Sequence, residues 1–156
     1  MRNLTDLVNG RPRAAAAVGF GAAGTALAAF WYLPLTIQGR HPVLHSLLFV
    51  VLPGLAAAAA GAALGRWLVR PARLSPGGTA ALRGAGIATV ALLIFAPLFA
   101  SLFALTGPGP ERWNVLGLTA LLLEGGALAA WLPSAAIGAG VGWLLYRLGR
   151  GDSTRA

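Results

Sequence analysis

Four long apolar stretches constrain the fold of this chain more than any other feature of its sequence. They cover about residues 14–37, 43–65, 84–107 and 115–146. A bilayer has a hydrocarbon core ~30 Å thick, which ~20 residues of helix cross with every backbone hydrogen bond made inside the segment. Each stretch reaches this length, and none alternates in hydrophobicity as a transmembrane β-barrel strand does. The sequence therefore predicts one all-α membrane domain with four transmembrane helices, ending in a disordered tail over 151–156.

The composition argues against a soluble enzyme. Apolar residues make up 57% of the 156 positions and charged residues only 10%, against roughly 25% charged residues in a soluble domain. The chain contains neither Cys nor Lys, which excludes disulfides, thiolate metal sites, Cys nucleophiles and Lys Schiff bases. It also lacks the G-x-S-x-G and H-E-x-x-H motifs and any pair of carboxylates suited to acid–base work. We therefore expect no enzymatic activity.

Arginine is distributed unevenly among the connecting segments. Ten of the twelve Arg residues precede the first span, separate the second from the third, or follow the fourth, and only Arg40 and Arg112 lie in the other two loops. The positive-inside rule then predicts that both termini and the middle loop are cytoplasmic, in the cytoplasmic (inner) membrane. The net charge of +8 suits anionic lipid headgroups. We expect no nucleic-acid binding, because no cytoplasmic segment is long enough to fold as a binding domain.

Small residues predict where the spans pack, since helices in lipid associate through close approach of their backbones. The second span has Ala or Gly at nine of the ten positions from 56 to 65, Leu64 being the other, which predicts a central helix with neighbours all round. In the third span, Phe95, Phe99 and Phe103 form a separate large stripe, interpreted as lipid contact or as a surface for a partner subunit, quinone or pigment. The predicted packing residues are Gly61, Gly65, Ala96, Ala100, Ala104, Gly138 and Gly142.

The fourth apolar stretch is too long for a straight crossing. Its 32 residues would form a helix of ~48 Å, against a hydrocarbon core of ~30 Å. We expect it to tilt strongly, to break at Gly125-Gly126 or Pro133, or to begin outside the core. Counting back from Trp143 as an inner aromatic anchor places Glu124 near the outer boundary of the membrane.

Glu124 is the only acidic residue inside a predicted span. An ionisable group in a membrane is a functional candidate because its burial is costly. Glu124 is therefore a candidate for ion or proton coupling. Pairing with Arg40 or Arg112 in a hydrated interface is the structural alternative.

His41 and His45 are four residues apart and so share one face of a helix. Two imidazoles at this spacing can ligate a divalent metal, and a haem is a second option. Both residues can equally be interfacial residues at a helix start. We predict no cofactor, with metal or haem at this pair as the alternative. The topology also brings Tyr32, Gln38 and Glu124 toward the same outer side, where one polar cluster is a hypothesis.

Three functions remain open at this stage. The first is a non-catalytic accessory or assembly subunit of a larger membrane complex, or a homo-oligomer. The second is a small transporter or channel that uses Glu124, and the third is a metal- or haem-binding redox protein that uses His41 and His45. The expected partners are the lipid bilayer and other membrane subunits or further copies of the chain.

Overall fold

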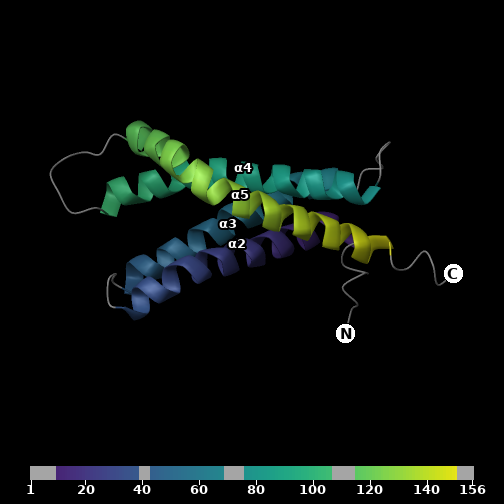
Figure 1. Ribbon diagram of the computed structural model, residues 1–156, viewed down its shortest axis with the longest axis horizontal. Coiled ribbons are helices and arrows are strands. Elements are labelled where there is room, and N and C mark those ends of the chain that lie inside the picture. Colours follow the sequence, from purple (N-terminus) through teal and green to yellow (C-terminus); the bar gives the residue numbers. More distant parts are fainter. Residues whose placement is uncertain (1–9, 39–42, 69–75, 107–114, 151–156) are drawn as a thin grey trace.

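The computed structural model describes residues 10–38, 43–68, 76–106 and 115–150, which form four long helices (Figure 1). The helices are α2 (Pro12–Ile37), α3 (Val43–Leu68), α4 (Pro76–Thr106) and α5 (Val115–Arg150). The described residues are almost entirely helical, with no strand among them. The all-α prediction is thus confirmed, and the predicted tail over 151–156 lies outside the described residues.

Three of the helices are long and apolar enough to cross a membrane. The qualifying stretches are Pro12–Pro34, Phe49–Leu68 and Gly77–Leu102, while α5 has a shorter apolar stretch, Val115–Glu124. Their length and composition support a membrane protein. Because α4 begins at Pro76, before the predicted span, Arg83 lies inside the helix and not in a connecting segment.

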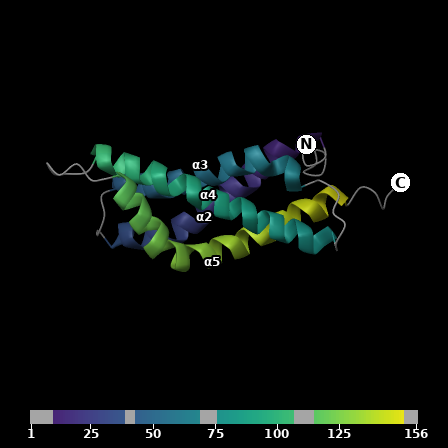
Figure 2. The ribbon, with the colours of Figure 1, turned by 90° about the horizontal axis from the view of Figure 1, so that it is seen from above.

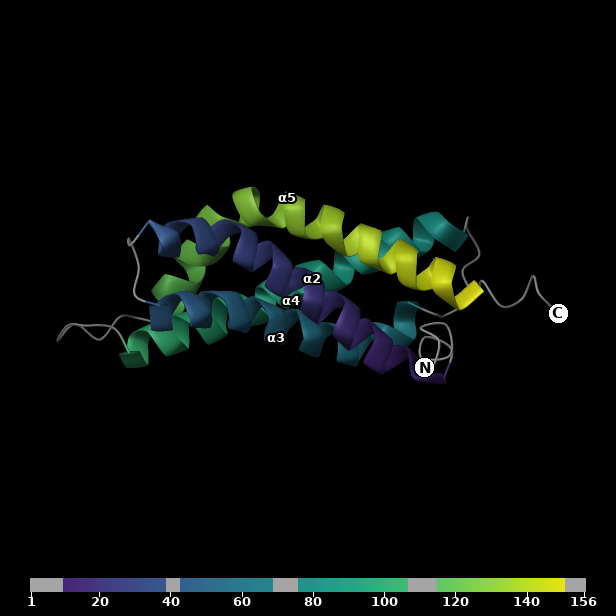
Figure 3. The same ribbon diagram turned by 90° about the horizontal axis from the view of Figure 1, so that it is seen from below.

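The 36 residues of α5 form one continuous helix that passes through Gly125-Gly126 and Pro133. The helix bends along its length (Figures 2 and 3). Proline removes a backbone donor and clashes with the preceding turn, which is a common cause of a kink. Of the alternatives drawn from the sequence, the break at Gly125-Gly126 or Pro133 is therefore not found, because the helix is continuous through these residues.

The helices form two antiparallel hairpins. α2 packs mainly against α3, and α4 mainly against α5, whereas the contacts of α3 with α4 and of α2 with α5 are fewer. In Figure 1 the hairpins diverge toward the end at which α2 and α4 finish. The expectation that the second span is central, with neighbours all round, is wrong. Ala59, Ala62 and Ala63 are exposed on α3, because α2 and α4 cover only its other sides.

Small residues bring the backbones of α2 and α3 into contact. A Cβ atom added to Gly61 would lie 2.7 Å from the carbonyl oxygen of Ala16, and one added to Gly65 would lie 2.9 Å from the Ala16 Cβ. From the other side, a Cβ on Gly24 would lie 2.9 Å from the Cβ of Ala57. These separations are shorter than real Cβ atoms adopt, so the hairpin requires glycine at these points.

A second close contact joins α4 to α5. Gly84 lies against the carbonyl of Gly138, and Gly142 lies against that of Ala80. A Cβ added to Gly138 would lie 2.6 Å from the carbonyl oxygen of Gly84. The two glycines of α5 are predicted from the sequence as packing residues, but their partner Gly84 is not. Of the alanines that it named on α4, the structure buries Ala96 and Ala100 and leaves Ala104 half-buried.

Aromatic rings connect three helices in the half of the bundle where the hairpins diverge. Tyr32 of α2 stacks on Phe49 of α3 with ring centroids 4.5 Å apart, and Phe49 contacts Phe99 of α4 at 4.8 Å. The ring centroids of Phe95 and Phe99 are 5.6 Å apart. Phe95 and Phe99 therefore contact other rings of the chain and are half-buried, so lipid contact alone does not describe them. The side chain of Phe103 lies outside the described part.

Every Arg within the described residues lies toward the end of the bundle where α2 begins and α5 ends. Two of them sit on tryptophan rings: Arg83 lies 5.6 Å from the ring centroid of Trp67, and Arg147 lies 4.8 Å from that of Trp143. Cation–π pairs of this kind place a charge and an amphipathic ring at one level, as in the interfacial belt of a membrane protein.

The close contact between α4 and α5 predicts opposite effects for two glycines of the same helix. Gly138→Ala should lower the free energy of unfolding by about 1–3 kcal/mol, because the new methyl group meets backbone. Gly140 has nothing within 4 Å of an added Cβ, so Gly140→Ala should raise it by up to about 1 kcal/mol through helix propensity. Denaturant titrations in detergent, followed by circular dichroism, measure both. Equal changes for the two variants would contradict this packing.

Candidate functional site

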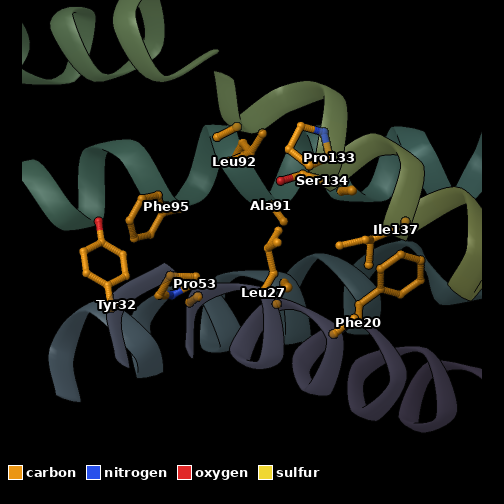
Figure 4. A pocket seen from close by; sticks show the side chains of 17 residues that line it. Phe20, Leu27, Tyr32, Pro53, Ala91, Leu92, Phe95, Pro133, Ser134 and Ile137 are labelled. Atoms are coloured by element: carbon orange, nitrogen blue, oxygen red, sulfur yellow. The ribbon is translucent and has the colours of Figure 1, made fainter. Parts of the chain in front are cut away.

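A cavity of about 440 Å³ lies between the two hairpins, and all four helices contribute to its wall. Figure 4 shows Phe20 and Ile137 at one end of it, and Tyr32 and Phe95 at the other. Ala91 lies between them. The two rings at the second end belong to the aromatic series that continues to Phe49 and Phe99.

The cavity exists because its wall is built largely from small side chains. Ala28 and Ala57 come from the first hairpin, Ala88 and Ala91 come from the second, and all four are buried. A leucine at any one of these positions would reach into the space. The residues that allow the helices to approach closely thus also leave room between the hairpins.

The described lining has almost no polar chemistry. None of its 17 side chains is charged, and hydroxyl groups come only from Tyr32 and Ser134. Pro53 and Pro133 also line the cavity. Each lacks a backbone N–H, so one carbonyl upstream in each helix loses its helical donor.

The cavity is partly open to the surroundings of the bundle and is not a sealed void. Water is a poor occupant for it, because a buried water needs ~2–4 polar partners. Hydrocarbon needs no such partners, so the wall suits an apolar occupant.

Of the polar residues that the sequence places on the outer side, the structure describes the side chains of Tyr32, Gln38 and Glu124. Glu124 is exposed on α5 and is not among the described residues that line the cavity. His41 lies outside the described residues, as do Arg40 and Arg112. His45 lies in the first turn of α3, but its side chain is outside the described part. Within that part, no three His, Asp or Glu side chains gather as a metal site.

One hydrogen bond between α4 and α5 is not predicted from the sequence. The indole N–H of Trp131 donates to the Thr89 hydroxyl oxygen at 3.0 Å, and that hydroxyl donates to the Ala85 carbonyl, also at 3.0 Å. The signal in the sequence is Trp131, a tryptophan in the interior of the predicted span 115–146. In an apolar medium an indole N–H requires an acceptor, and Thr89 supplies it.

This hydrogen bond predicts that Thr89→Val lowers the free energy of unfolding more than the same substitution at Thr119. Thr89→Val leaves the Trp131 N–H without its acceptor and should cost ~0.6 kcal/mol, up to ~1.7. The control is Thr119→Val, because the Thr119 hydroxyl bonds the Val115 carbonyl at 2.7 Å within one helix. A double-mutant cycle with Trp131→Phe measures the coupling between the two side chains. A coupling energy of zero would contradict the contact.

Taken together, the described cavity offers apolar contact and two hydroxyls, which is the chemistry of a binding site for a largely apolar molecule. Comparisons with known proteins found no match to this chain among family models, curated proteins or solved structures.

Proposed function

We propose that this chain is a four-span protein of the cytoplasmic membrane that acts without catalysis, as an accessory or assembly subunit of a larger complex or as a homo-oligomer. The observation that carries the proposal is the exposed alanine face of α3, formed by Ala59, Ala62 and Ala63. These three side chains are exposed, whereas Ala56, Ala57 and Ala60 of the same helix are buried. It offers a second chain the same kind of surface that pairs the helices inside the bundle.

In lipid, a helix face makes contacts either with acyl chains or with another helix, and its side chains decide which contacts are better. Exposed leucines such as Leu82 and Leu93, which are 76% and 54% exposed, make extensive contacts with acyl chains. An alanine face makes fewer contacts with lipid but allows a neighbouring backbone to approach closely. Inside this chain, contacts between glycine and alanine hold both hairpins together. Association with another membrane helix is the use of the α3 face that agrees best with this chemistry.

The other functions have less support from the described residues. A transporter that uses Glu124 requires this carboxylate on a path through the bundle, whereas Glu124 is exposed and away from the cavity lining. A redox protein requires ligands in addition to His41 and His45. Both hypotheses stay open as alternatives, and neither gains a specific observation.

Association through α3 predicts that larger side chains on its alanine face weaken the assembly. The double substitution Ala59→Leu and Ala62→Leu should lower the affinity for the partner by about fivefold or more, since overpacking costs ~1–3 kcal/mol. The protein is extracted in mild detergent, and its assembly state and co-purifying chains are determined by native mass spectrometry. The matched control is Ala136→Leu, at an exposed position of α5.

Loss of the partner in the double variant, with retention in the control, is the expected result. A wild-type chain that is monomeric and alone in native membranes and mild detergents would overturn the proposal. So would a double variant that keeps its partner at unchanged affinity.

We also propose an orientation of the chain in the membrane, in which both termini lie in the cytoplasm. It is supported by the Arg distribution and by the two Arg–Trp pairs at one end of the bundle. In this arrangement α5, with 36 residues or ~54 Å of helix, is the fourth span and crosses the membrane while bent.

The natural absence of cysteine allows a direct test of orientation. A single cysteine at Gln38→Cys should react with a membrane-impermeant maleimide in intact cells, because this exposed residue directly follows α2. Ser153→Cys should react only after the membrane is permeabilised. The unsubstituted chain is the control for background labelling. The reverse labelling pattern would contradict the orientation, and labelling of both sites in intact cells would contradict an even number of spans.

A further inference from the structure

We infer that the cavity between the two hairpins is a binding site for an uncharged, largely hydrocarbon molecule. Two sources share this chemistry: the acyl chain of a membrane lipid and a free apolar solute. The inference is independent of the proposed role in assembly, because the cavity and the alanine face of α3 are different surfaces.

The size of the cavity fits such an occupant. Its volume of about 440 Å³ is roughly three times that of the ~150 Å³ apolar cavity that binds benzene. It also lies within the ~300–1,000 Å³ typical of small-molecule sites. A single water cannot fill it, and a cluster of waters would lack polar partners on most of the wall.

The lining disfavours charged ligands, in addition to limiting the size of a ligand. A charged ligand would lose its hydration without gaining a counter-ion, because no charged side chain lines the cavity among the described residues. Tyr32 and Ser134 place two hydroxyl groups in an otherwise apolar wall (Figure 4). This combination of an apolar body with a few polar points is typical of sites that bind and orient a neutral ligand.

The arrangement of helices provides a way in from the bilayer. The two hairpins contact each other less than the helices within each hairpin do. Separating the hairpins therefore disrupts fewer contacts than opening either one. A hydrocarbon chain can enter between them without passing through water.

The test uses the full chain reconstituted in phosphatidylcholine vesicles with one of two photoreactive probes. The first is a phosphatidylcholine that carries a diazirine in the middle of an acyl chain, and the second is the free solute adamantyl diazirine. Peptide mass spectrometry locates the adducts. We expect them to concentrate on lining residues such as Leu27, Leu92 and Ile137, and to saturate with unlabelled competitor. Leu82 and Leu93, which face outward, report general contact with lipid.

The substitution Ala91→Phe fills the cavity from its centre and should reduce the lining adducts at least fivefold, while those at Leu82 and Leu93 stay unchanged. Ala22→Phe adds the same ring to an exposed position of α2 and should change neither set. Helix content by circular dichroism verifies that each variant folds. If Ala91→Phe fails to fold, Ala23→Leu fills the same cavity with a smaller increase in volume.

Saturable labelling by the lipid-borne probe identifies an acyl chain as the occupant, and saturable labelling by the free probe alone identifies a free solute. Both results support the inference. It is overturned if lining adducts from both probes are no more frequent than those at the outward leucines. It is equally overturned if the folded cavity-filling variant leaves the lining adducts unchanged.

Discussion

Close approach of helix backbones is the interaction on which the rest of this structure depends. Lipid tails are as apolar as leucine, so burying apolar surface gives little drive for helices to associate in a membrane. Gly61 and Gly65 meet the start of α2, and Gly84 meets Gly138 and Gly142 across the second hairpin. Each pairing works only because one or both residues lack a side chain. The hairpins are therefore the firm units of the fold, and the weaker contacts lie between them.

The cavity follows from the same constraint. Alanine and glycine permit tight contact where two helices meet directly, but they cannot fill the space where four helices surround a common centre. Ala57 and Ala91 face this centre and leave about 440 Å³ between them and their neighbours. Phe20 and Ile137 lie at one end, and Tyr32 and Phe95 lie at the other. Hydrocarbon can occupy a wall of this kind without polar partners, whereas water cannot.

The sequence predicts the helices well, because the length and hydrophobicity of each apolar stretch are sufficient to make it a helix. It also indicates small-residue positions such as Gly61, since a G-x-x-x-G spacing is visible in one chain segment. It does not indicate which helix meets which, and for this reason α3 was expected at the centre and Gly84 was overlooked. The cavity has no local signature either, because its wall combines single residues from all four helices. The same limit applies to Phe99, whose ring contacts Phe49 of α3.

The cavity and the exposed alanine face lie on different sides of α3. A substitution on one side can therefore be tested without altering the other. Ala57 is buried and lines the cavity, whereas Ala59 and Ala62 are exposed. In an α-helix, positions two residues apart point about 200° away from each other, given ~3.6 residues per turn. A leucine at Ala59 therefore alters the outer face without reaching the cavity, and a phenylalanine at Ala91 of α4 fills the cavity without touching that face. Loss of assembly and loss of ligand binding are consequently independent observations, each with its own variant.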